Sequence, residues 1–132
     1  MRERSGRLAD VTMSAGGKGQ LGHAGGVVLQ LLAEKTGLDE ALTGAMRLPG
    51  FCPLHPRGRV LVDLACAIVL GAEAIGDIAL LEHQRAVLGP TASAPTVWRT
   101  LDETGELQRR RIARARAAVR RRAAPRRAPR SP

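Results

Sequence analysis

The sequence contains very few aromatic side chains, because Phe51 and Trp98 are its only two and tyrosine is absent. Sheets favour aromatic and β-branched residues, whereas Leu and Ala are strong helix formers. Hydrophobic residues make up 44% of the chain, which is enough for a core. Because so few of them are aromatic, this core has to be built from Leu, Val, Ile and Ala. The composition therefore predicts an all-α fold, and a length of 132 residues corresponds to one small domain.

Cysteine and long apolar segments are also scarce. Cys52 and Cys66 are the two cysteines, and the chain starts with polar and glycine residues instead of an apolar signal segment. The longest apolar run, residues 64–72, is too short to cross a bilayer, which takes ~20 residues. We therefore expect a cytoplasmic protein with free thiols and no membrane partner.

Acidic residues are rare in the last quarter of the chain. Residues 1–100 hold ten Arg and Lys against nine Asp and Glu, whereas residues 101–132 hold eleven Arg against three acids. Nearly all of the net charge of +9 therefore lies in this last segment. Such an excess favours a polyanionic partner, and nucleic acid fits better than an anionic membrane because the segment has no large apolar face.

Apolar spacing predicts helices from residue 24 onward. One helix runs to a stop at Gly37, and a second covers about residues 38–46 before a loop at 47–58 that is rich in Pro and Gly. The strongest pattern follows, as a buried stripe in steps of three and four residues: Leu61, Leu64, Ile68, Gly71, Ile75 and Ile78. Asp63 falls elsewhere on the helical wheel, and glycines break this run at a point that the pattern does not locate.

Residues 75–103 have the outline of a helix-turn-helix unit. An apolar helix is followed by the turn Gly89–Pro90 and by a second helix, which Ser93 can cap and Pro95 can start. We expect two faces on that second helix, an inner one with Val97, Trp98 and Leu101 and an outer one with Thr96, Arg99, Thr100 and Glu103. The candidate DNA contacts are Ser93, Thr96, Arg99 and Thr100, because arginine binds guanine or phosphate and helix N-termini favour phosphate. An ordinary helical hairpin with a solvated outer face would give the same pattern.

A basic helix is expected over residues 105–124, since Arg and Ala are both good helix formers and Pro125 prevents continuation. Its candidate phosphate contacts are Arg109, Arg110, Arg111, Arg114 and Arg116. Binding of this kind releases counterions, so it is strong and sensitive to salt but not specific for sequence. We expect residues 1–22 to be flexible and residues 125–132 to be a disordered Arg/Pro tail. The last ten residues contain almost only Arg, Ala, Pro and Ser. A shifted reading frame in GC-rich DNA explains this composition as well as a role in polyanion binding does.

No metal site or catalytic centre is predicted. Cys52 and His55 have the spacing of two zinc ligands, but a site needs three or four and no further motif supplies them. Cys66 lies within the apolar stripe and is expected in the core. The pairs at 82–83 and 102–103 contain acid–base chemistry, but nothing in the sequence suggests a pocket around them. We expect no cofactor and no small-molecule substrate.

Several segments resemble the N-terminal region of bacterial DDE-type insertion-sequence transposases, the group-one DDE family. They are HAGGVVL at residues 23–29 with TGL at 36–38, GRVLVDLA at 58–65, GAEAIGDIALL at 71–81 and GPTASAPTVWR at 89–99. The last of these is similar to the family phrase GPVASDPTVWR and is the most specific. Together they cover roughly residues 20–120, so the resemblance assigns residues 23–104 to a helical transposase-like domain.

The resemblance implies a helical, DNA-binding region that precedes a ribonuclease-H-like catalytic domain. In the family, three carboxylates of that later domain bind two Mg²⁺ ions for strand transfer. No Asp or Glu follows Glu106, so no catalytic carboxylate carries over. We therefore expect a truncated transposase fragment that is not an enzyme, binds insertion-sequence terminal repeats and could form oligomers. A free-standing helix-turn-helix regulator with a basic tail and a general nucleic-acid-coating peptide are the alternatives.

Overall fold

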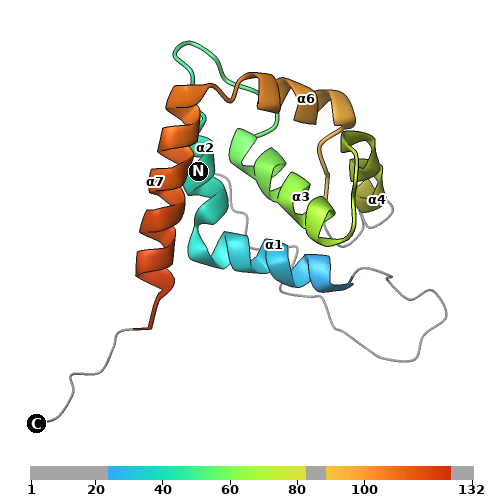
Figure 1. The fold of residues 1–132 in the computed structure, drawn as a ribbon, viewed down its shortest axis with the longest axis horizontal. Coiled ribbons are helices and arrows are strands. Elements are labelled where there is room, and N and C mark those ends of the chain that lie inside the picture. The colour runs from blue at the N-terminus through green and yellow to red at the C-terminus, as the bar shows by residue number, and fades with distance from the viewer. Residues whose placement is uncertain (1–23, 83–88, 126–132) are drawn as a thin grey trace, which may run out of the picture.

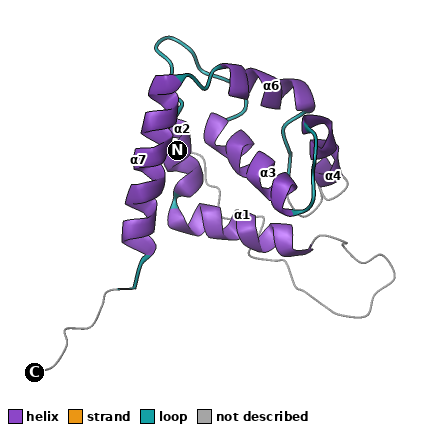
Figure 2. Ribbon diagram, in the orientation of Figure 1, coloured by secondary structure: helices purple, strands orange, loops and turns teal. Residues whose placement is uncertain are grey.

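The computed structural model describes residues 24–82 and 89–125, and these residues form helices and loops without any strand (Figures 1 and 2). In chain order the elements are α1 (Ala24–Thr36), α2 (Leu38–Ala45), α3 (Arg57–Val69), the 3₁₀ helix η1 (Ile75–Ile78), α4 (Ala79–Glu82), α6 (Ala94–Asp102) and α7 (Glu106–Ala123). The predicted all-α class is confirmed. Two further predictions, a flexible segment at residues 1–22 and a disordered tail at residues 125–132, concern residues that lie outside the described ones, apart from Pro125.

The corner between α1 and α2 follows the sequence signal closely. Gly37 has a φ of 70°, in the left-handed region that favours glycine, and its N–H donates to the carbonyl of Glu34 at 3.1 Å. This turn ends α1 and lets α2 begin at the next residue. The predicted stop at Gly37 and the predicted second helix are both confirmed.

Helices α2 and α3 approach each other closely at Gly58. A Cβ atom at this position would overlap the backbone oxygen of Asp39 and the backbone nitrogen and hydroxyl of Thr43. The Thr43 hydroxyl fills the contact, because it accepts the N–H of Gly58 at 3.0 Å and donates to the Asp39 carbonyl at 2.9 Å. Only a residue without a side chain allows the two backbones to come this near.

Helix α3 is the centre of the fold and is covered on two sides. One side belongs to the larger core, which contains Val27, Val60, Ala67, Ile78, Leu81, Ala92 and Val97. The other belongs to a smaller cluster of Ala33, Leu42, Val62 and Cys66, against which Ile112 of α7 also packs. Figure 1 shows the arrangement, with α1 alongside α3, α6 over one end of α3, and α2 and α7 together at one edge.

The single buried stripe predicted for this region was wrong in part. Ile68 is 59% exposed and Leu64 is only half-buried, whereas Asp63, predicted to lie off the stripe, is 1% exposed. The reason is that neighbours cover α3 on two sides, so the buried residues form a broad band instead of one line. Helix α3 also ends at Val69, and Gly71 turns the chain at a φ of 102°. Ile75 and Ile78 therefore belong to the separate element η1.

The break before η1 is stabilised by Asp77. Its carboxylate accepts the backbone N–H groups of Glu73 and Ala74, both at 2.9 Å. These hydrogen bonds favour the charged form and hold the pKa of Asp77 below its usual range.

No described helix is long and apolar enough to span a lipid bilayer.

The two cysteines should react with thiol reagents at very different rates. Cys66 is 3% exposed, and burial together with the nearby charge of Asp63 raises the pKa of its thiol to about 11, whereas Cys52 is exposed. Because the thiolate is the reactive form, we expect a disulfide reagent to modify Cys52 quickly and Cys66 only after denaturation. The Cys52→Ser variant provides the control, and fast labelling of that folded variant would contradict the burial of Cys66.

Candidate nucleic-acid interface

Helix α6 presents a different outer face from the predicted one. Val97 and Thr100 are both 0% exposed, whereas Trp98 is 56% exposed. The prediction that Trp98 faces inward and that Thr100 is available for DNA was therefore wrong. The hydroxyl of Thr100 donates to the carbonyl of Thr96 at 2.8 Å, which satisfies its polar atom inside the core.

The reason lies in the phase of the helix. Val97 occupies the inner face in either case, and that face can be completed by Thr100 and Leu101 or by Trp98 and Leu101. Ala92 and Val97 both belong to the larger core, next to α3 and η1, and Thr100, one turn after Val97, is buried on the same side of α6.

Three of the predicted α6 contacts remain accessible. Ser93 and Arg99 are exposed and Thr96 is half-buried. Ser93 occupies the N-cap position but makes no side-chain hydrogen bond to the helix backbone; its hydroxyl lies 3.0 Å from that of Thr96. The side-chain cap predicted at Ser93 is thus absent.

The other half of the helix-turn-helix unit is only partly described. Its first helix was expected from residue 75, where the structure has the 3₁₀ helix η1 followed by the short α4. Residues 83–88, which lead from α4 toward the turn, lie outside the described residues. The second helix is present at the predicted position, and the complete motif stays a prediction.

Glu103, predicted on the outer face, instead joins α6 to α3. The guanidinium of Arg57 donates to both of its carboxylate oxygens, from Nε at 2.7 Å and from Nη2 at 2.6 Å. The same guanidinium lies 5.6 Å from the centre of the Phe51 ring. One buried arginine therefore fixes the end of α6, the start of α3 and the loop before α3.

Helix α7 is attached to the domain along a narrow apolar side. Val119 is 5% exposed, and Ile112 packs against the smaller core cluster. The two residues lie seven positions apart, which is two turns of helix, so they share one side. Figure 2 shows α7 beside α2 at the edge of the molecule, after the chain has turned at Gly105. This attachment leaves most of the helix circumference to solvent.

The arginines of α7 occupy that free circumference. All eight are exposed: Arg109, Arg110, Arg111, Arg114, Arg116, Arg120, Arg121 and Arg122. Glu106 pairs with two of them, with Arg109 at 3.1 Å and with Arg110 at 3.1 Å. Among the described residues, the other six have no acidic partner. The five arginines predicted as phosphate contacts, Arg109 to Arg116, are thus all exposed, and Arg120, Arg121 and Arg122 of the same basic run extend the surface to the end of the helix.

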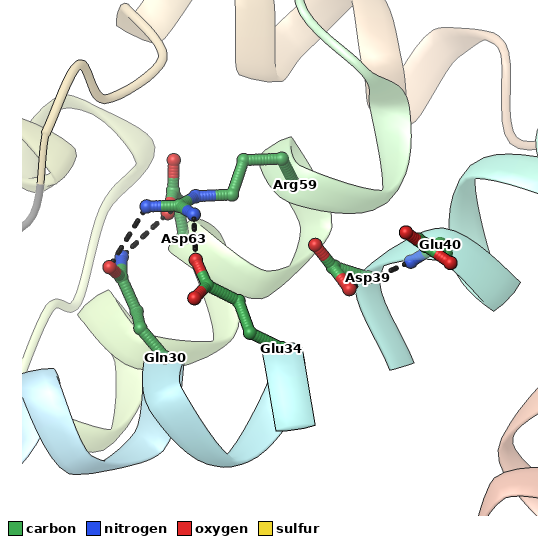
Figure 3. Close-up of polar contacts among 6 residues, drawn as sticks. All are labelled: Gln30, Glu34, Asp39, Glu40, Arg59 and Asp63. Atoms are coloured by element: carbon green, nitrogen blue, oxygen red, sulfur yellow. Dashed lines mark hydrogen bonds and ion pairs between the residues drawn. The ribbon is translucent and has the colours of Figure 1, made fainter. Parts of the chain in front are cut away.

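Arg59 differs from the arginines of α7, because it has a structural role in the domain. It contacts Asp63, Glu34 and Gln30 at 3.1, 3.1 and 2.9 Å, and Gln30 also donates to Asp63 at 2.8 Å (Figure 3). Burial raises the pKa of the Asp63 carboxyl, an effect that the charge of Arg59 opposes. The cluster joins α1 to α3 through hydrogen bonds to Oδ1 of Asp63, whereas Oδ2 of the same carboxylate is buried without a hydrogen-bond partner among the described residues.

Among residues 24–82 and 89–125, no group of three or more His, Cys, Asp or Glu side chains is placed to hold a metal ion. Comparisons with protein-family models, curated proteins and solved structures gave no match. The exposed arginine surface of α7 and the accessible residues of α6 are therefore the candidate site on physical grounds.

Proposed function

We propose that this chain is the DNA-binding N-terminal part of a DDE-type insertion-sequence transposase. The observation that carries the proposal is α7, which holds eight exposed arginines on a helix anchored by Ile112 and Val119. An anchored helix presents its charges to the phosphate backbone in a fixed arrangement, and contacts of this kind supply most of the affinity of DNA-binding proteins. Binding to bacterial DNA places the protein in the cytoplasm.

Duplex DNA suits this surface better than a folded protein partner. A protein partner would have to supply a continuous acidic surface along the whole helix, whereas a duplex carries one charge per ~1.7 Å of its axis. Leu107, at the start of α7, is the one large apolar side chain that is exposed on this helix. Beyond it, the exposed residues between the arginines are small, such as Ala113, and offer a protein interface little apolar surface to bury.

The resemblance supplies the family within the class of DNA-binding proteins. Its most specific segment, residues 89–99, contributes Ala92 and Val97 to the core and leaves Trp98 and Arg99 exposed on α6. The segment thus combines packing residues with accessible ones, as expected for a unit that folds and also binds. Since no Asp or Glu follows Glu106, we assign this chain no catalytic step.

A test of the proposal compares α6 with α7. If α6 reads base sequence, Arg99→Ala should reduce the preference for the terminal repeats of the element by ~1–3 kcal/mol, the value of one good base contact. Arg116→Ala is the matched control, because a phosphate contact should weaken binding to every duplex equally. Competition binding of terminal-repeat and random duplexes measures both.

Two outcomes of that competition would contradict parts of the proposal. Equal loss on both duplexes for Arg99→Ala would make Arg99 a phosphate contact and remove the recognition role of α6. Equal affinity of the unchanged protein for terminal-repeat and random duplexes would favour the general nucleic-acid-coating protein. A specific site unrelated to any terminal repeat would favour the free-standing regulator.

A further inference from the structure

An open groove of about 700 Å³ lies between the loop after α2 and the first turn of α7. Its lining is mostly apolar, and the residues are Gly44, Arg47, Leu48, Pro49, Gly50, Phe51, Cys52, Leu107, Gln108 and Arg111. Phe51 and Leu107 are 48% and 55% exposed, so two large apolar side chains face solvent here. Neither side chain belongs to the two core clusters of the domain.

The Phe51 ring is held in place. Gly50 has a φ of 69°, and the N–H of Phe51 donates to the carbonyl of Leu48 at 3.3 Å, which forms a tight turn before the ring. The guanidinium of Arg57 lies over the ring and is itself fixed by its two hydrogen bonds to Glu103. A ring restrained in this way loses little side-chain entropy when a flat partner stacks on it.

The charge of the groove is of one sign. Arg47 and Arg111 line it and are both exposed, and none of the ten lining residues is acidic. Arg111 also belongs to the exposed arginine surface of α7, so the groove is continuous with the proposed DNA-binding surface. An occupant that matches both features has a flat apolar part for Phe51 and Leu107 and an anionic part for the two arginines.

We propose that this groove binds an unpaired nucleotide at a DNA end, with the base against Phe51 and Leu107 and its phosphates beside Arg47 and Arg111. Stacking on aromatic side chains together with a basic groove is the general mode of single-strand recognition. Gln108 offers an amide that can meet the edge of the base. The inference rests on the proposed function, since it adds an end-recognition site to the duplex-binding surface.

The test compares a blunt duplex with the same duplex carrying a single-stranded thymidine extension. The unchanged protein should bind the extended duplex about fivefold or more tightly, as expected for one stacked base. An extension of abasic sugar phosphates should give no such gain, because it keeps the charges and removes the bases. Phe51→Leu should lose the gain while it retains its affinity for blunt duplex, and Phe51→Trp should keep it.

Leu54→Ala is the control variant, because Leu54 belongs to the same loop, is 93% exposed and does not line the groove. Equal binding of blunt and extended duplexes, an equal gain from the abasic extension, or a gain retained by Phe51→Leu would each overturn the inference. So would tight, Phe51-dependent binding of an acidic amphipathic peptide without any gain from the extension. If the unchanged protein did not bind blunt duplex at all, that result would instead contradict the proposed function. A comparison of the affinities for thymidine oligonucleotides and for abasic oligonucleotides would then test the groove by itself.

Discussion

Replacement of Gly58 by alanine is expected to destabilise the fold by about 3 kcal/mol, at the upper end of the usual cost of overpacking. A Cβ atom at this position meets the backbone of Asp39 and Thr43, which cannot move aside as a flexible side chain could. Separation of α2 from α3 would also break the hydrogen bond from the Gly58 N–H to the Thr43 hydroxyl. The measurement is denaturant unfolding followed by circular dichroism.

The control for this prediction is Gly44→Ala, one helix away. Gly44 also lies in a helix, α2, but nothing is within 4 Å of a Cβ built on it. Alanine exceeds glycine in helix propensity by up to about 1 kcal/mol, so Gly44→Ala should be neutral or slightly stabilising. If Gly58→Ala and Gly44→Ala changed the free energy of unfolding by the same amount, the gain in helix propensity would outweigh any steric overlap at position 58. The close approach of α2 and α3 would then be wrong.

Loss of three arginines from α7 is expected to weaken DNA binding on the order of a hundredfold at low salt, whatever the sequence of the duplex. We choose Arg114, Arg120 and Arg121 because they are exposed and do not pair with Glu106. Glutamine retains helix propensity while it removes the charge. Three lost phosphate contacts should flatten the slope of log affinity against log salt by about 2.7.

The same three positions changed to lysine provide the matched control. Lysine keeps the charge, so affinity and salt slope should stay close to those of the unchanged protein. Fluorescence anisotropy over a series of salt concentrations measures both variants, and circular dichroism checks that α7 remains helical. An unchanged salt slope for the glutamine variant would show that this part of α7 does not contact phosphate.

Much of the helix pattern could be predicted from sequence because its signals are local. Gly37 and the proline-rich loop mark ends that depend on the backbone preferences of single residues. Helices α1, α2, α6 and α7 begin and end close to the predicted positions. Local signals of this kind need no knowledge of the neighbouring helices.

The errors arose where a partner helix decides the outcome. Either Trp98 or Thr100 can complete an amphipathic face beside Val97, and the packing of α6 against α3 and η1 buries the threonine and leaves the tryptophan exposed. Asp63 is buried on the side of α3 that faces α1, where Gln30 of α1 donates to its carboxylate. The groove around Phe51 depends on three segments together, so the sequence signal was limited to one conspicuous aromatic residue in a loop.

The density of charge on α7 has a consequence for the free protein. Arginines three or four positions apart, such as Arg110 with Arg114 and Arg116 with Arg120, repel each other by a few tenths of a kcal/mol per pair. Dissolved salt screens this repulsion and so favours the helix, while the same salt weakens attraction to phosphate. The helix thus behaves as a short polyelectrolyte, for which a nucleic acid is one counterion among others. The ionic strength that best orders α7 in isolation is therefore expected to be higher than the one at which the proposed binding to DNA is tightest.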